Sequence, residues 1–412
     1  MKINYYSYIL LVIAGFFVLG SCRKEKIQPG QANTFIKYYG GNATNTAGSV
    51  DQTSDGGYIL IGTSNANGNG KDIIVTKTDK YGNTLWTKVI GGPGDDIGNF
   101  IQTTSDGGYI ISATRPESAS PLYSDAHIIK LNSDGSVNFD NSYGYPNYNE
   151  SSTQVIITTD GGYISMGASD SSSSLEAKKA VYIVKTNNQG TYSWSYKYGN
   201  NFLVNTGSSI VEVNDSTYFT SATSIYPDSM DILLTEGRYQ TIGNSYNLSS
   251  NFSKNSFYNN SEARGNISTA SGIILGNSGN AFVVGNTKNN DIYLIDFQIG
   301  NPGICTFKSF GTSVKDSAAS FTQTSDGGFI IAGTTLNSSN NSPDIFVVKI
   351  DASGNVSWMK NYGGTGNDYG TYVKQTSDGG YIVSGTVQFG GNETGSNPVM
   401  ALFKLNNKGD LE

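Results

Sequence analysis

The sequence predicts an all-β fold, a seven-bladed β-propeller of four-stranded blades, and three observations predict it. One short phrase recurs seven times along the 412 residues. Each interval between two copies contains four runs with strand character. The fourth run that the last repeat lacks occurs near the N-terminus, where it can complete the last blade and close the ring.

The recurring phrase first occurs as Ser54-Asp55-Gly56-Gly57-Tyr58-Ile59. The repeat period is about 50 residues, which is typical of propellers and other repeat architectures. Two of the copies are degraded and keep only part of the phrase. The further copies begin at Ser105, Thr159, Asn214, Asn277, Ser325 and Ser377.

Four runs fill each repeat. A run such as 99–104 precedes the Asp-Gly-Gly turn, and Asp-Gly between apolar runs favours a hairpin because Gly accepts positive φ. Runs such as 58–62, 72–77 and 85–90 follow the turn, so neighbouring strands are expected to be antiparallel. The second and third runs are apolar at consecutive residues, as in strands buried on both faces. Such burial is expected where each sheet is stacked between two others around a ring.

The fourth runs carry residues with other roles. Four lysines share one repeat position, and we expect them on an exposed outer strand, where charge discourages edge pairing. All three tryptophans share another position, four residues after a turn glycine, with Phe139 in the same place in the second repeat. We interpret this aromatic position as packing between blades. The lysines are Lys37, Lys88, Lys308 and Lys360, and the tryptophans are Trp86, Trp194 and Trp358.

The ends of the chain predict ring closure. The seventh repeat stops at Glu412, before its fourth run begins. The segment Phe35–Gly41 aligns with the fourth run Trp358–Gly364 of the preceding repeat. The N-terminal segment is therefore expected to supply the outer strand of the last blade, which an open solenoid would not need.

With these motifs, the chain resembles a large group of bacterial secreted and lipid-anchored propellers whose repeats read QTSDGGYI…D…K.D..GN..W.K.YGG. The resemblance covers residues 34–412. The element Asp79…Gly82…Trp86 is also similar to a shortened form of the tryptophan-docking motif of quinoprotein propellers. The resemblance implies the fold and brings no catalytic residues to this chain. Because the docking motif is shortened and no adjacent cysteine pair occurs, no quinone or other cofactor is expected.

The N-terminus predicts export and lipidation. Residues 1–21 read as a signal peptide, because Lys2 precedes an apolar stretch that is too short to span a bilayer. Leu19-Gly20-Ser21-Cys22 resembles the lipobox of bacterial lipoproteins, which implies a diacylated, palmitate-type anchor on Cys22. Residues 22–33 then form the lipidated cysteine and a short tether, and residues 34–412 form the propeller. The expected location is the cell envelope, anchored to the outer membrane on its periplasmic or surface side.

Composition excludes several functions. The net charge is −7 without a basic patch, which argues against nucleic acid as a partner. With Cys22 lipidated, Cys305 has no disulfide partner and is expected to be a packed strand residue. His127 is the single histidine, at a strand position that is apolar or aromatic in other repeats. No metal site and no catalytic residue are therefore predicted, because His-based metal centres and Ser-His-Asp chemistry lack parts.

The two ends of the blades are expected to differ. One end carries the Asp-Gly-Gly and Gly-Asn turns. The other carries loops that vary between repeats, which predicts a binding face there. One exception at the turn end is the segment 237–250, which we expect to be a flexible excursion. The variable loops include residues 64–71, 115–124, 169–180 and 388–398.

One acidic position recurs at the variable end. Asp96, Asp316 and Asp368 each lie five residues after an aligned glycine, and Asn45 matches them. They precede the innermost strand, so we expect them around the mouth of the central channel. Three interpretations stay open: capping of the loop backbone in an Asx-type turn, binding of a cation or polar ligand, and catalysis. Aromatic residues of the same loops suit a sugar-binding face, and the candidate ligand face includes Tyr145, Tyr148 and Tyr369.

These features predict a non-enzymatic binding or scaffold lipoprotein of the bacterial cell envelope. Its ligand face would lie on the variable loops between second and third strands, with a glycan or an envelope protein as the ligand. The alternative is a carbohydrate-active enzyme, similar to a glycoside hydrolase, that uses loop carboxylates on the same face. A pocket with two carboxylates about 5–10 Å apart would favour the enzyme.

Overall fold

The structure is a computed structural model that describes residues 34–41, 43–68, 70–116, 123–170, 179–199, 204–226, 229–240, 245–253, 267–276, 279–299, 301–390 and 397–411. The predicted signal peptide, Cys22 and the tether lie outside the described residues. Residues Asn33–Glu412 form one compact unit. In the part of the chain that is described, no helix is long and apolar enough to cross a bilayer.

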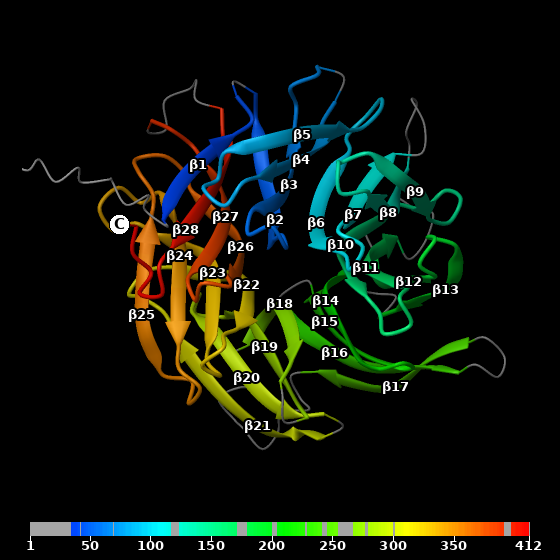
Figure 1. Ribbon diagram of the computed structural model, residues 1–412. Helices are drawn as coiled ribbons and strands as arrows, with labels where there is room; N and C mark the ends of the chain where they lie inside the picture. The colour runs from blue at the N-terminus through cyan, green and yellow to red at the C-terminus, as the bar shows by residue number, and fades with distance from the viewer. Residues whose placement is uncertain are drawn as a thin grey trace, which may run out of the picture. The chain divides into compact units, whose positions relative to one another are not determined.

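The described strands form seven four-stranded antiparallel blades around a central axis (Figure 1), which confirms the predicted propeller. One parallel residue pair, Lys179 with Val204, joins blades 3 and 4. Blades 1 to 3 contain β2 (Asn45–Gln52), β3 (Tyr58–Ser64), β4 (Asp72–Thr78) and β5 (Thr84–Ile90); β6 (Ile97–Thr103), β7 (Tyr109–Pro116), β8 (Ser124–Leu131) and β9 (Val137–Tyr143); and β10 (Glu150–Ile157), β11 (Tyr163–Asp170), β12 (Lys179–Thr186) and β13 (Tyr192–Tyr198). Blades 4 and 5 contain β14 (Val204–Asn214), β15 (Thr217–Tyr226), β16 (Ser229–Gln240) and β17 (Ser245–Ser253); and β18 (Ile267–Leu275), β19 (Asn280–Thr287), β20 (Ile292–Gln298) and β21 (Asn301–Phe310). Blades 6 and 7 contain β22 (Asp316–Gln323), β23 (Phe329–Leu336), β24 (Pro343–Ile350) and β25 (Val356–Tyr362); and β26 (Tyr369–Gln375), β27 (Tyr381–Val387), β28 (Val399–Leu405) and β1 (Phe35–Tyr39).

The Asp-Gly-Gly phrase forms the turn between the first and second strands. In blade 1, Gly56 has a φ of 81°, which an L side chain rarely adopts, so glycine suits this position. Asp55 Oδ1 accepts a hydrogen bond from the Gly57 N–H at 2.9 Å. Its Oδ2 accepts one from Lys77 Nζ, on the third strand, at 2.8 Å. We call this interaction the Asp–Lys turn pair, and it occurs in five blades: Asp55–Lys77, Asp106–Lys130, Asp160–Lys185, Asp326–Lys349 and Asp378–Lys404.

The core lies between blades rather than within one. Every residue of β3 and β4 is buried, as the consecutive apolar runs predict. One hydrophobic cluster joins Ile61 and Val75 of blade 1 to Ile111 and Ile129 of blade 2. A radial stack thus covers both faces of each middle strand, which is why these strands show no alternation of apolar and polar residues.

The recurring aromatic position packs between blades, as predicted. The Trp86 ring lies 6.0 Å from the ring of Tyr109 in the next blade, and the Trp358 ring lies 5.9 Å from that of Tyr381. A side chain on the facing turn glycine would meet the indole: a Cβ on Gly135 would lie 3.0 Å from Trp86. Glycine at this turn therefore allows both the positive φ and the close approach of the neighbouring blade.

The N-terminal strand closes the ring. β1 pairs with β28 along its whole length, from Phe35 opposite Lys404 to Tyr39 opposite Met400. The Phe35 ring then packs against Tyr58 of blade 1 at 6.0 Å. The prediction that the N-terminal strand supplies the outer strand of the last blade is therefore confirmed.

Three of the outer-strand lysines form hydrogen bonds to the neighbouring blade. Lys37 Nζ donates to Asn83 Oδ1 of the next blade at 3.1 Å, and Lys308 Nζ donates to Asn355 Oδ1 at 3.1 Å. Lys360 likewise bonds to Asp410. These lysines therefore cover the turn of the neighbouring blade, a role that the sequence pattern did not indicate.

The extra residues of blade 4 lengthen a hairpin. β16 and β17 pair from Leu233 opposite Ser253 to Gln240 opposite Ser245. This hairpin projects from the ring in Figure 1. The expected flexible excursion is therefore wrong for the paired residues, because they form an antiparallel ladder with one register shift between Glu236 and Gly237. Residues 241–244 lie outside the described part.

Candidate functional site

The four residues at the recurring acidic position are buried, with exposed fractions of 0–1 %: Asn45, Asp96, Asp316 and Asp368. Asp96 Oδ2 accepts from the Gly92 N–H at 2.8 Å, and Asp368 Oδ2 accepts from the Gly364 N–H at 2.8 Å. Asp316 bonds in the same way to the equivalent loop amide. Each carboxylate holds the loop before the inner strand, which agrees with the capping interpretation.

The position of these residues differs from the expected ring at the channel mouth. None of the four lines either chamber of the central channel described below. The Asp96 N–H donates to the Lys71 carbonyl at 2.7 Å, and the Asp368 N–H donates to that of Pro343 at 2.7 Å. Each acidic residue therefore lies under its own loop, beside the start of a third strand. A part in ligand binding stays a prediction.

The carboxylates at this position have different neighbours. Arg115 Nε donates to Asp96 Oδ1 at 2.6 Å, so a cation faces this acid between blades 1 and 2. Between blades 6 and 7, burial raises the pKa of Asp368, and the charge of the nearby Asp344 raises it further. Sequence position alone does not distinguish these two environments.

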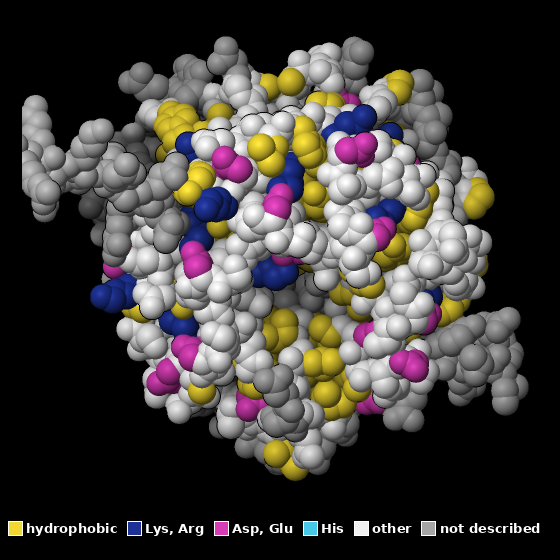
Figure 2. Space-filling view, in the orientation of Figure 1, with side chains coloured by type: hydrophobic (Ala, Val, Ile, Leu, Met, Phe, Trp, Pro, Cys, Tyr) yellow, Lys and Arg dark blue, Asp and Glu magenta, His cyan; other side chains and the backbone are white. Residues whose placement is uncertain are grey.

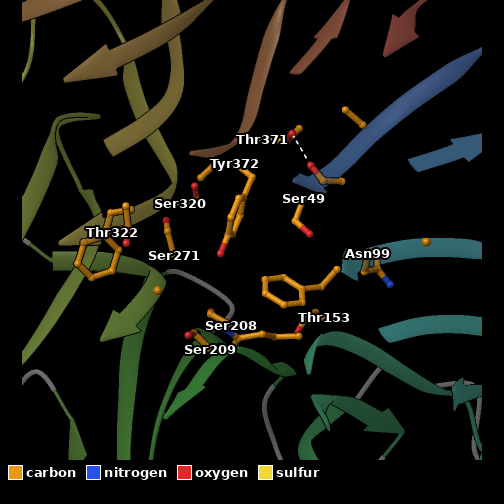
Figure 3. A pocket seen from close by; sticks show the side chains of 18 of the residues that line it. Ser49, Asn99, Thr153, Ser208, Ser209, Ser271, Ser320, Thr322, Thr371 and Tyr372 are labelled. Atoms are coloured by element: carbon orange, nitrogen blue, oxygen red, sulfur yellow. Dashed lines mark hydrogen bonds between the residues drawn. The ribbon is translucent and has the colours of Figure 1, made fainter. Parts of the chain in front are cut away.

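A ring of β-bulges surrounds the central channel, because each inner strand has a register irregularity at the same point. Side chains of this ring surround the central channel, and Figure 3 marks the hydrogen bond of Thr371. Five of them donate to a carbonyl of the next blade at 2.6–3.0 Å: Asn99 to Ser152, Thr153 to Gly207, Ser208 to Ala270, Ser271 to Ala318 and Thr371 to Gly48. At the two other junctions, Ser49 Oγ accepts from the Ile101 N–H at 2.7 Å and Ser320 Oγ accepts from the Val373 N–H at 2.8 Å. This bulge ring joins all seven blades.

The channel contains two chambers, of about 420 Å³ towards the variable end and about 410 Å³ towards the turn end. Figure 2 shows the molecule hollowed near the centre of the ring, with hydrophobic side chains on part of the wall. Phe100 and Tyr372 line both chambers, with ring centroids 5.6 Å apart. Burial raises the pKa of Tyr372, so its phenol stays neutral. The Ser and Thr hydroxyl groups that line the chamber at the variable end form hydrogen bonds between blades. We therefore assign them a structural role.

Two carboxylates, those of Asp51 and Glu212, line the chamber at the turn end. Asp51 Oδ2 accepts from the Thr103 N–H at 3.0 Å, and Lys374 bonds to its other oxygen. Glu212 Oε2 accepts from the Thr159 N–H at 2.7 Å. Burial raises the pKa of Glu212. Both acids thus link neighbouring blades at the turn end.

Two predicted aromatic residues come together at the variable end. The rings of Tyr145 and Tyr148 lie 6.4 Å apart, and Lys197 Nζ lies 3.9 Å from the first ring centre and 4.6 Å from the second. Lys197 Nζ also donates to Glu150 Oε1 at 3.2 Å. A cation over aromatic faces stabilises their arrangement. Tyr369 lies elsewhere, at the start of β26, and is 46 % exposed.

Sequence reasoning missed Glu150 and Lys197. Glu150 is fully buried at the start of the inner strand of blade 3, where other blades have the recurring Asp. It follows its glycine, Gly144, by six residues instead of five, so the fixed spacing did not detect it. An acidic residue immediately before an inner strand is the signal that would have found it.

His127 lies on β8 as predicted, and it belongs to a polar network. Its Nδ1 is 2.8 Å from Asp140 Oδ1, and Arg115 joins Asp140 to Asp96. Burial works against ionisation of Asp140, but the hydrogen bond and charge of His127 and the charge of Arg115 lower its pKa. No sequence pattern indicated these contacts, because they connect four separate segments, at Asp96, Arg115, His127 and Asp140.

The remaining predicted residues add no site. Cys305 packs against a hydrophobic cluster of blades 4 and 5, and burial raises the pKa of its thiol. Among the described residues, no group of three or more His, Cys, Asp or Glu side chains is placed to hold a metal ion. Cys22 lies outside the described residues.

Comparisons with known proteins bear on the fold alone. No family model and no curated protein matches the chain. A protein of unknown function from Dyadobacter fermentans aligns with 90 % of this chain and 97 % of its own, at 9 % identity and a TM-score of 0.49. A puromycin hydrolase aligns with 88 % of this chain and 52 % of its own, at 8 % identity and a TM-score of 0.51. A mutant of puromycin hydrolase aligns with 84 % of this chain and 52 % of its own, at 11 % identity and a TM-score of 0.46. The chain thus spans about half the length of puromycin hydrolase, and the likeness supports the propeller architecture.

Proposed function

We propose that the chain is a non-enzymatic binding or scaffold lipoprotein of the bacterial cell envelope, with its ligand face at the variable end of the blades. The observation that carries this proposal is the fixed pair of Tyr145 and Tyr148. Lys197 and Glu150 hold these rings beside a variable loop before any ligand arrives. Aromatic side chains held in this way supply contact area at low entropic cost.

A binding screen tests the ligand face. The full chain, kept in mild detergent, would be applied to immobilised glycans and to envelope proteins, followed by the double variant Tyr145→Ala with Tyr148→Ala. We expect binding to fall at least tenfold in the double variant. Tyr81→Ala is the matched control, since this tyrosine lies at the turn end beside Lys80. Loss of binding in the Tyr81 variant alone would place the ligand at the opposite end and contradict the proposal.

The burial of the recurring acids favours binding over catalysis. Asp96, Asp316 and Asp368 are bound to loop amides and are almost fully buried, and Asp368 lies in the wall of a pocket of about 520 Å³. The alternative, a carbohydrate-active enzyme, would require a loop carboxylate that reaches a glycosidic bond. Release of reducing ends from any screened glycan, abolished by Asp368→Asn, would favour the enzyme instead.

The anchor is tested separately. The Leu-Gly-Ser-Cys segment at residues 19–22 motivates the proposal of a lipid on Cys22. We expect Cys22→Ser to remain unprocessed or to leave the membrane fraction, while Cys305→Ser behaves as the wild type. A Cys22 variant that fractionates and migrates like the wild type would show that no lipid is attached there.

A further inference from the structure

A groove opens between the outer strand of blade 2 and the last two strands of blade 3. Its volume is about 710 Å³, within the usual range of ligand sites. β9 forms one wall, and β12 and β13 form the other; the blades are neighbours in Figure 1. The side chains that matter are Asn141, Tyr145, Tyr182, Tyr192 and Ser195.

The groove lies beside a position that a lysine occupies in four other blades. At other junctions a lysine of the fourth strand extends over the turn of the next blade, as Lys37 does over Gly82 and Asn83. Blade 2 has Asn141 at this position, and its Nδ2 stops at the Gly190 carbonyl at 3.0 Å. The shorter amide leaves the space beyond the turn free. The repeat position that carries a lysine in β1, β5, β21 and β25 thus carries a shorter side chain beside this groove.

Three tyrosines and one serine, Ser195, form the interior of the groove. Tyr145 and Tyr192 are 39 % and 56 % exposed, whereas Tyr182 is buried behind Tyr145 with ring centroids 5.8 Å apart. The Tyr145 and Tyr192 hydroxyls lie 3.0 and 3.2 Å from Ser195 Oγ. Two partly exposed tyrosine side chains therefore flank a cluster of hydroxyl groups, each of which is both a donor and an acceptor.

The charges near the groove are balanced within the protein. Asp140 is bound by Arg115 and by His127. Lys197 lies against the Tyr145 ring and bonds to Glu150. A charged ligand would find no unpaired partner here, and the loss of its hydration would oppose binding. The groove therefore suits an uncharged ligand with apolar faces and many hydroxyl groups.

We propose that this blade 2–3 groove binds a neutral oligosaccharide. The apolar C–H face of a pyranose ring packs on Tyr192 and Tyr145, and its hydroxyl groups bond to Ser195 and Asn141. The inference rests on the proposed binding function and names its ligand class and its position. The groove begins at Tyr145, the residue that it shares with the predicted ligand face, and continues along the outer surface between the blades.

The test uses the full chain in mild detergent and isothermal titration calorimetry with defined hexasaccharides. The neutral probes are cellohexaose, xylohexaose, mannohexaose and maltohexaose, and the charged probe is hexagalacturonate. We expect at least one neutral probe to bind and the charged probe to bind at least tenfold more weakly. Asn141→Lys, which restores the covering side chain of other blades, and Tyr192→Ala should each weaken binding at least tenfold. Tyr38→Ala, a 46 % exposed tyrosine on β1 of blade 7, should change affinity less than twofold.

Thermal unfolding of each variant confirms that it folds. Binding of hexagalacturonate alone, or of none of the neutral probes, would overturn the inference. So would a neutral probe whose affinity is unchanged by both Asn141→Lys and Tyr192→Ala; if that affinity still falls in the Tyr145 and Tyr148 double variant, the proposed ligand face stands and only the groove is wrong. Because Tyr192 and Asn141 are not part of the aromatic pair, the two proposals fail separately.

Discussion

Blades 5 and 6 are neighbours in the ring and differ at one position of their third strands. In blade 6, Lys349 pairs with Asp326 of the turn at 2.9 Å. In blade 5, the same register position holds Asp296, whose Oδ1 accepts from Asn280 Nδ2 at 2.8 Å. Blade 4 has an acid there too, Glu236. The two blades with an acid at this position are the two with a degraded turn phrase.

This difference shows what the repeated phrase encodes. The strand lysine occurs where the turn has the full Asp-Gly-Gly sequence: blade 5 has Ser278 at the aspartate position, and blade 4 keeps Asp215 but has Ser216 and Thr217 in place of the two glycines. The complete phrase therefore reports the Asp–Lys turn pair. Blades 4 and 5 still fold as four strands, and Ser208 and Ser271 still connect them to their neighbours in the bulge ring. Packing between blades and the bulge ring therefore suffice for a blade, and the turn pair is an addition.

The largest expected effect tests whether a turn pair can hold a blade without its outer strand. Blade 7 has the pair Asp378–Lys404, and β1 lies directly beside Lys404. Deleting Phe35–Gly41 removes a whole ladder and the Phe35 contact with Tyr58. Each lost core side chain costs about 2–5 kcal/mol, and a domain has about 5–15 kcal/mol to lose. We expect unfolding or aggregation, measured by circular dichroism and size-exclusion chromatography. A soluble monomer with the wild-type melting temperature would show that closure is dispensable.

The second effect converts one type of blade towards the other. Lys349→Glu puts into blade 6 the residue that blade 4 carries as Glu236, next to the turn aspartate Asp326. Two like charges then share a partly buried site, and we expect a loss of about 2 kcal/mol in the free energy of unfolding. Denaturant unfolding measures it. The double variant Lys349→Glu with Asp326→Asn should recover part of the loss; equal stability of the single and double variants would contradict the coupling of the two positions.

The third effect separates the blades by pH. Although burial opposes it, the hydrogen bonds from lysine, threonine and the turn amide lower the pKa of Asp55, Asp106 and Asp326 to about 2. These groups stabilise the fold above their unfolded pKa of about 3.9, and the stabilisation is lost as the pH falls towards 2. Burial raises the pKa of Asp296 in blade 5. Its effect on the free energy of unfolding therefore has the opposite pH dependence: Asp296 favours the folded state while it is protonated, and this stabilisation is lost as the pH rises through the raised pKa.

We therefore expect stability to fall steeply between about pH 4 and pH 2. Denaturant midpoints of the wild type and of Asp296→Asn, measured from pH 2 to pH 7, check both parts. The variant should gain stability near neutral pH and keep the acid decline. A midpoint that does not change below pH 4 would mean that the turn pairs contribute nothing.

The smallest effect concerns the bulge ring that both kinds of blade share. Ser271→Ala removes the hydrogen bond to the Ala318 carbonyl at the junction of blades 5 and 6. One such bond contributes about 1 kcal/mol. Ser133→Ala, at an exposed turn, is the control and should be neutral. Equal denaturant midpoints for the two variants would indicate that water replaces the lost bond.

Much of this architecture follows from the sequence because the repeat multiplies each signal. The Asp-Gly-Gly turns, the aromatic position of Trp86 and the exchange of Phe35–Gly41 are each visible in the chain and present in the structure. The prediction that segment 237–250 is flexible was wrong for its paired residues. Its Ser- and Asn-rich composition suggested a loop, but β16 and β17 continue their antiparallel pairing into this segment.

The site was less predictable because its geometry depends on contacts between repeats. The regular spacing of Asp96, Asp316 and Asp368 identified a shared role but not burial under the loops. The cluster around Lys197 combines residues from the loop after blade 2 and from the outer strand of blade 3. No spacing rule within one repeat indicates that such residues meet.

The exchange of the outer strand has a consequence for biosynthesis. β1 is among the first parts of the propeller to leave the ribosome, and its partner β28 is among the last. Blade 7 therefore stays incomplete until β28 has been synthesised, and closing so long a loop slows folding. If the proposed export holds, this delay is favourable, because an unfinished ring cannot reach its final form before secretion. Until β1 and β28 meet, the strand edges of blade 7 stay exposed and can pair with other chains.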